Sequence, residues 1–169
     1  VAAIQLASRA GARVLATASS PERLEELKHL GLDEGINYRE DDFVSSVRKL
    51  TDNKGANLII DPVGGDVLKN SLSALAYRGH VITFGNAGRD FCKFDISPLL
   101  MNNQSLSGYF QGAEIFTERM QNLISQLLAE VADGKLQVVL DREYPLAEAS
   151  KAHAFIESRR AVGRVLLIP

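Results

Sequence analysis

Short apolar runs alternate with amphipathic segments along the whole chain. Apolar runs typical of buried parallel strands lie at 12–16, 35–38, 56–60, 80–84, 106–110, 138–144 and 164–168. Apolar residues recur at helical spacing within 1–10, 21–30, 43–50, 66–75, 96–101, 114–132 and 146–158. Strands that alternate with helices predict an α/β fold, with a doubly wound parallel sheet covered by helices on both faces.

The corner between the first predicted strand and the next helix carries candidate chemistry. Ser20 fits an N-cap and Pro21 fits the first helical turn. Ligands of doubly wound sheets bind at the carboxyl ends of strands, where this corner lies. The hydroxyls of Ser19 and Ser20, the helix N-terminus and nearby Arg23 suit a phosphate, and no acid is placed to hold a ribose 2′-hydroxyl. The same residues also describe an ordinary helix start, so both interpretations stay open.

Composition narrows the classes of partner. The 169 residues are enough for one domain with a sizeable core. The net charge of −2 gives no electrostatic footprint for nucleic acid. Cys92 is the single cysteine, and the three histidines have no partner at metal-ligand spacing. No apolar run is long enough to span a membrane. We expect no metal site, and neither nucleic acid nor a membrane as a partner.

A set of short motifs carries a resemblance to a known family. They lie at 2–7, 16–24, 36–39, 61–65, 84–86, 144–146, 152–153 and 163–169, and include Asp61-Pro62-Val63-Gly64-Gly65. In order and spacing they resemble the cofactor-binding half of the medium-chain dehydrogenase/reductase superfamily, on its zinc-independent quinone oxidoreductase branch. The resemblance implies a Rossmann-type domain over 1–135, and a strand–helix–strand over 136–169 that packs on a catalytic domain. It also implies a cytoplasmic enzyme that transfers hydride from NADPH to a quinone or an enone.

The resemblance implies cofactor contacts at strand ends and no catalytic acid or base. The residues expected to surround the 2′-phosphate are Ser19, Ser20, Arg23 and Tyr38. Those expected near the ribose are Val63, Gly64 and Gly65. Those expected at the nicotinamide are Phe84, Gly85, Asn86, Gly108, Tyr109 and Phe110, with Arg164 as a further cofactor contact. Asp61 precedes a proline, and we interpret it as a turn former rather than a catalytic group.

The chain departs from the family pattern at its start. The family's glycine-rich phosphate loop, the first strand of its sheet and its catalytic domain have no counterpart in this sequence. We therefore expect the strands that begin at Ala12 and Ala56 each to lose a neighbour. We also expect weak NADPH binding, no activity of the chain alone, and a homo-oligomer formed through a strand edge. A zinc-dependent alcohol dehydrogenase fragment and a non-catalytic nucleotide-binding or structural module remain as alternatives.

Overall fold

The computed structural model describes residues 1–90, 93, 95–158 and 160–169, so Cys92 lies outside the described part of the chain. The chain forms two compact units. The terminal unit combines Val1–Asn37 with Asn122–Pro169, and the central unit is Tyr38–Gln121. Each unit has its own parallel strands and its own buried apolar side chains.

The first part of the terminal unit is a helix–strand–helix–strand segment. It consists of α1 (Ala2–Arg9), β1 (Leu15–Ala18), α2 (Pro21–Lys28) and β2 (Glu34–Asn37). β1 and β2 pair in parallel along their whole length. The predicted start of α2 is confirmed: Ser20 is its N-cap and Pro21 is its first residue. Proline is tolerated there because the first helical turn leaves its N–H groups without intrahelical partners.

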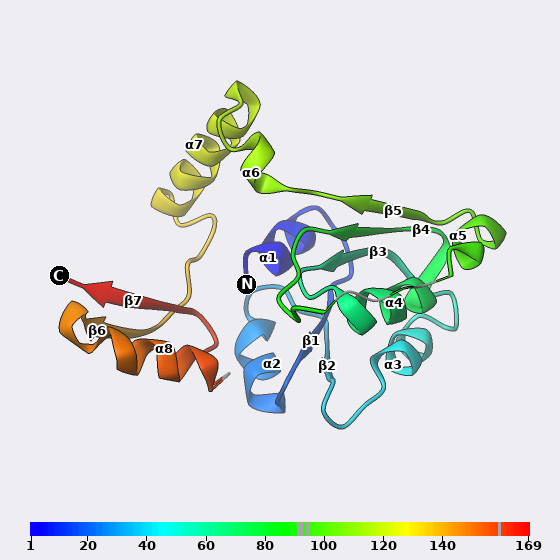
Figure 1. Ribbon diagram of the computed structural model, residues 1–169, viewed down its shortest axis with the longest axis horizontal. Coiled ribbons are helices and arrows are strands. Elements are labelled where there is room, and N and C mark those ends of the chain that lie inside the picture. The colour runs from blue at the N-terminus through cyan, green and yellow to red at the C-terminus, as the bar shows by residue number, and fades with distance from the viewer. Residues whose placement is uncertain (91–92, 94, 159) are drawn as a thin grey trace. The chain divides into compact units, whose positions relative to one another are not determined.

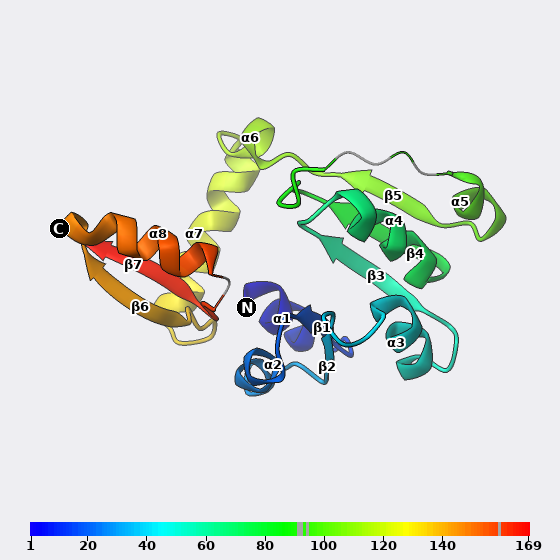
Figure 2. The same cartoon turned by 60° about the horizontal axis from the view of Figure 1, so that its bottom comes forward.

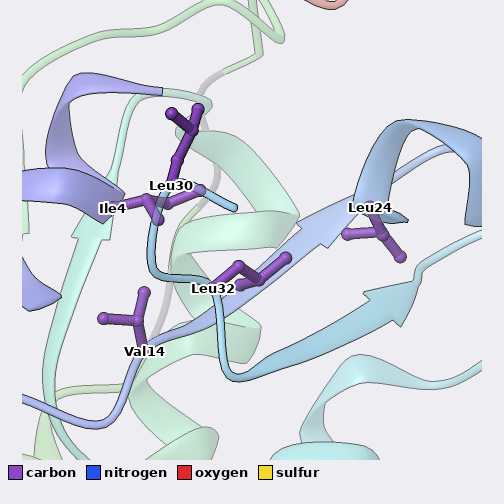
Figure 3. Packing of buried hydrophobic residues seen from close by; sticks show 5 residues of the cluster. All are labelled: Ile4, Val14, Leu24, Leu30 and Leu32. Carbon is purple, nitrogen blue, oxygen red and sulfur yellow. The ribbon is translucent and has the colours of Figure 1, made fainter. Parts of the chain in front are cut away.

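An apolar cluster holds this segment together. Its buried side chains come from α1, the start of β1, α2 and the connection to β2, and are Ile4, Val14, Leu24, Leu30 and Leu32 (Figure 3). Val139, far along the chain, packs against the same cluster. The buried side-chain amide of Gln5 adds two hydrogen bonds to the backbone of Gln137: its Nε2 donates to the carbonyl at 2.9 Å, and its Oε1 accepts from the N–H at 2.8 Å. The terminal unit is thus built from both ends of the chain.

The second part of the terminal unit is a strand–helix–strand. After α7 (Glu118–Ala132) come β6 (Leu140–Pro145), the 3₁₀ turn η1 (Leu146–Glu148), α8 (Ala149–Glu157) and β7 (Arg164–Ile168). β6 and β7 pair in parallel, and α8 lies along them (Figure 2). The right-handed crossover expected of such a unit explains why one helix can cover both strands.

The central unit contains a three-stranded parallel sheet. Its elements are α3 (Phe43–Leu50), β3 (Ala56–Asp61), α4 (Gly65–Ala74), β4 (Leu75–Thr83), α5 (Ser97–Met101), β5 (Ser105–Gly108) and α6 (Gln111–Glu114). The strand order is β3-β4-β5. Leu72 of α4 packs with Leu75 and Val81 of β4, so α4 covers one face of this sheet (Figure 1).

In the described part of the chain, β4 is the one strand with a neighbour on both sides, so β1 and β3 are both edge strands. Among the described residues, β1 pairs with β2 alone, and β3 pairs with β4 alone. This agrees with the expectation that the strands beginning near Ala12 and at Ala56 would each lose a neighbour. Every strand pair is parallel, as the alternation of strands and helices predicts.

Several predicted boundaries are wrong. The first strand is Leu15–Ala18, which begins and ends later than predicted. The helix predicted over 114–132 begins only at Glu118, because Thr117 caps it: the Thr117 Oγ1 accepts from the Met120 N–H at 3.3 Å. β4 begins at Leu75 rather than at residue 80. The turn predicted at Arg78 and Gly79 lies within β4, since Arg78 has a φ of 61° and the β3–β4 register shifts there.

Two glycines allow a matched test of backbone strain. Gly55 has a φ of 86°, and an added Cβ would lie 2.6 Å from the Leu75 carbonyl, whereas Gly134 has a φ of 70° with nothing within 4 Å of that position. We expect Gly134→Ala to lower the free energy of unfolding by about 1–2 kcal/mol, the usual cost of this φ region. Gly55→Ala should cost at least about 3 kcal/mol in urea denaturation, because the clash adds to the strain. Equal losses would contradict this packing.

Candidate functional site

The carboxyl ends of β3, β4 and β5 lie level at one edge of the central sheet. Asp61 is in register with Thr83, and Thr83 is in register with Gly108. Each of the loops that leave this edge carries residues of the predicted cofactor site, at 63–65, 84–86 and 108–110. Ligands of parallel α/β sheets bind at such an edge, so the central unit brings the residues predicted for the ribose and nicotinamide to one suitable edge.

The carboxylate of Asp61 organises the loop after β3. This side chain is only 2% exposed. Its Oδ1 accepts from the N–H of Val63 at 2.9 Å, and its Oδ2 accepts from the N–H of Gly64 at 3.1 Å. Both oxygens are therefore engaged by backbone donors, which supports the interpretation of Asp61 as a turn former.

The loops after β3 and β4 approach each other closely at Gly64. Gly64 has φ 75° and ψ −162°, a conformation that favours glycine, and an added Cβ would lie 2.8 Å from Asn86 Oδ1. Asn86 Oδ1 is buried and has no hydrogen-bond partner within the described part of the chain. Buried polar atoms in native proteins nearly always have a partner. An N–H or O–H group of a ligand would satisfy this acceptor.

The loop after β5 is open and aromatic. Nothing lies within 4 Å of a Cβ added at Gly108, so the space beside this backbone is vacant of other protein atoms. Tyr109 donates its N–H to the Thr83 carbonyl at 2.8 Å, which fixes the loop against β4. The rings of Tyr109, Phe110 and Phe84 are exposed. Exposed rings beside open backbone can stack on a flat ligand ring.

The corner between β1 and α2 in the terminal unit carries residues predicted to bind the 2′-phosphate. Ser19 is buried, and its Oγ accepts from Arg23 Nη1 at 2.9 Å. Arg23 Nη2 also donates to the Ala161 carbonyl at 2.5 Å. A guanidinium held at a helix N-terminus is suited to binding an anion.

The Ser20 hydroxyl has a partner that the sequence analysis missed. It donates to the Glu22 carboxylate, and this hydrogen bond holds the pKa of Glu22 below its usual range. The corner therefore has an acid one residue into α2, beside a hydroxyl that was expected to face a phosphate. The Ser-Pro-Glu sequence contained this signal, because a hydroxyl at the N-cap and a carboxylate in the first turn are close neighbours.

Two further predicted site residues lie next to strand ends. Tyr38 directly follows β2, whose last residue Asn37 is in register with Ala18, and 44% of Tyr38 is exposed. Arg164 begins β7 and donates its backbone N–H to the Val139 carbonyl at 2.8 Å. Arg164 is close to the Val1 amino group, whose pKa is lowered first by burial and then by the Arg164 charge.

The described residues contain neither a cluster of metal ligands nor a membrane-spanning helix. No group of three or more His, Cys, Asp or Glu side chains among them is arranged to hold a metal ion. In the same residues, every helix is too short or too polar to cross a lipid bilayer.

Comparison with known proteins identifies the family to which this chain is similar. Residues 1–130 match the zinc-binding dehydrogenase family. The chain is 32% identical to quinone oxidoreductase 1 of Escherichia coli (strain K12) over 173 residues, which cover 99% of this chain and 52% of that protein. It is 29% identical to a 2-haloacrylate reductase of Burkholderia sp over 166 residues, covering 94% of this chain and 49% of that protein.

A solved structure agrees with the sequence relatives. The structure of Escherichia coli quinone oxidoreductase complexed with NADPH superposes with a TM-score of 0.88 at 29% identity, over 99% of this chain and 53% of that one. The chain thus spans about half the length of the relatives that it matches. It belongs to the zinc-binding dehydrogenase family of the medium-chain dehydrogenase/reductase superfamily, where it matches the Rossmann-type half of the quinone oxidoreductase branch.

Proposed function

We propose that this chain is the NADPH-binding part of an oxidoreductase that reduces a quinone or an enone in the cytoplasm. The observation that carries the proposal is the open edge at Gly64, Asn86 and Gly108, in a chain similar to a quinone oxidoreductase that binds NADPH. The similarity to a 2-haloacrylate reductase supports an activated double bond as the alternative acceptor. Residues 1–135 would form the nucleotide-binding domain, and 136–169 would pack on the catalytic domain of a longer protein.

The terminal unit would hold the adenosine end of the cofactor. Arg23 would bind the 2′-phosphate as a charge-assisted donor, with Ser19 orienting its guanidinium. Ser20 would contribute its backbone N–H at the start of α2, because its hydroxyl is engaged by Glu22. Tyr38 and Arg164 would complete the contacts after binding.

The central unit would hold the ribose and nicotinamide end. The backbone of Val63, Gly64 and Gly65 would lie along the ribose, where a side chain at Gly64 would collide with Asn86. Phe84, Gly85 and Asn86, with Gly108, Tyr109 and Phe110, would line the nicotinamide pocket. NADPH supplies the hydride when it is bound. The chain therefore needs to bind, orient and enclose the cofactor rather than to transfer protons.

Two other functions would be separated by direct assays. A zinc-dependent alcohol dehydrogenase would carry stoichiometric zinc in the longer protein and oxidise alcohols. A non-catalytic module would bind NADPH without consuming it. Loss of NADPH absorbance on adding a quinone, in a protein free of zinc, would support the proposed reductase and exclude both alternatives.

Arg23→Ala tests the adenosine end. Removing a charge-assisted contact typically costs about 1–3 kcal/mol, so the affinity for NADPH should fall by roughly five- to 150-fold. The affinity for NADH should change little, since NADH has no 2′-phosphate. Fluorescence titrations of the two cofactors would measure both constants, and equal losses would refute the assignment of Arg23.

Gly108→Val tests the nicotinamide end. The space around the Gly108 Cβ position is open, so we expect the thermal midpoint of unfolding to be unchanged. In the longer protein that carries the catalytic domain, the valine should instead obstruct the nicotinamide and lower NADPH-dependent quinone reduction at least about tenfold, as expected when the reacting geometry is disturbed. Binding of 2′,5′-ADP, which lacks the nicotinamide, is the control and should not change. Full hydride transfer with unaltered cofactor affinity would place the pocket elsewhere.

Self-association tests the open strand edges. β1 and β3 each leave one row of backbone groups unpaired among the described residues, and such edges favour pairing with another chain. We therefore propose a homo-oligomer formed through a strand edge. Multi-angle light scattering should give a mass at least twice that of the monomer, and a monomer at micromolar concentration would argue against it.

A further inference from the structure

A line of hydrogen bonds connects β6 to the corner that carries Arg23. Asp141 Oδ2 accepts from the Val162 N–H at 2.7 Å. The carbonyl of the preceding residue, Ala161, accepts from Arg23 Nη2 at 2.5 Å, and Arg23 Nη1 donates to Ser19 Oγ at 2.9 Å. These residues all belong to the terminal unit, although Arg23 and Ala161 are 138 positions apart in the sequence.

An irregularity in β6 explains why Asp141 reaches the loop before β7. Leu140 pairs with Arg164 and Arg142 pairs with Val165, so two steps along β6 match one step along β7. Asp141 is the extra residue of this bulge. A bulge breaks the strand alternation and redirects the side chain of the residue that it adds. Here the exposed carboxylate of Asp141 accepts a hydrogen bond from a backbone N–H.

The loop that supplies the Ala161 carbonyl is fixed on both sides of Val162. On one side, the Arg164 N–H donates to the Val139 carbonyl at 2.8 Å. On the other side, Arg160 Nε donates to Ser158 Oγ at 3.2 Å. The bond from Asp141 acts on the N–H of Val162, which shares one peptide plane with the Ala161 carbonyl, so it helps to set the direction of this carbonyl.

We propose that Asp141 is a positioning residue that determines cofactor selectivity through the Ala161 carbonyl and Arg23. This rests on the proposed function, because it assumes that Arg23 meets the 2′-phosphate of NADPH. A guanidinium held by Ser19 and Ala161 loses less conformational freedom when an anion binds. Loss of the Asp141 bond leaves the peptide between Ala161 and Val162 less firmly oriented, and ordering the guanidinium then costs part of the free energy of binding.

Two conservative variants separate geometry from charge. Asp141→Asn keeps an oxygen acceptor at the same place but removes the negative charge. Asp141→Glu keeps the charge but moves the oxygen by one methylene. Positioning predicts that Asp141→Asn retains the NADPH affinity within about twofold, whereas Asp141→Glu and Asp141→Ala lose about three- to tenfold, the usual range for one hydrogen bond. Affinity for NADH should stay within about twofold in all three.

Asp33→Ala is a matched control. Asp33 Oδ2 also accepts a backbone N–H at 2.7 Å, from Val14 in the same unit, but it has no bond in the line that leads to Arg23. Its loss should lower the thermal midpoint while leaving the ratio of NADPH to NADH affinity unchanged. A role of Asp141 in stability alone would give the same pattern as this control.

The experiment is a set of fluorescence titrations with NADPH and NADH, on the wild-type protein and each variant, with Arg23→Ala alone and combined with Asp141→Ala. The proposal is supported if Asp141→Ala and Asp141→Glu lower the NADPH-to-NADH ratio, Asp141→Asn does not, and the double variant matches Arg23→Ala. It is overturned if Asp141→Asn loses as much as Asp141→Glu, or if the two single effects add. If Arg23→Ala leaves the ratio unchanged, the assignment of Arg23 itself fails; if only the Asp141 variants leave it unchanged, the positioning role alone fails.

Discussion

Parallel pairing of β3, β4 and β5 is the constraint on which the candidate site of the central unit depends. In a parallel sheet every strand ends at the same edge, so loops that are distant in sequence leave from one line. The register of Asp61, Thr83 and Gly108 puts three such loops together. The buried Asp61 carboxylate then closes the first loop through two backbone N–H groups, which leaves Gly64 against Asn86.

The terminal unit depends on a different kind of contact. Its two parts are far apart in sequence and are joined by polar side chains that reach backbone groups. Gln5 bonds both backbone groups of Gln137, and Arg23 bonds the Ala161 carbonyl. Because backbone carbonyls are present whatever the side chain, such bonds place no demand on the identity of the residue contacted. They nevertheless bring the segment after α8 to the corner where a phosphate would lie.

The candidate site contains a feature that costs stability. Asn86 has a buried acceptor with no partner in the described chain. Each unsatisfied buried polar atom in a native structure calls for an explanation, and a ligand is one. Gly64, which lies against this acceptor, occupies a backbone region that favours glycine. Both residues lie on the edge where the resemblance of the sequence predicts cofactor contacts.

The sequence by itself determined the alternation of strands and helices, the parallel sheets, the cap and first turn of α2, and the turn at Asp61. These follow from periodicity and from contacts between near neighbours, which a sequence displays directly. Thr117 escaped notice because the apolar residues around it keep a helical period, although its hydroxyl begins a new helix. Only the tertiary structure decided that Arg23 donates to the Ala161 carbonyl and that Asp141 accepts from the N–H of the next residue, Val162. Those contacts arise from strand pairing, a bulge and chain reversal, which join residues 21 and 138 positions apart without leaving a local pattern.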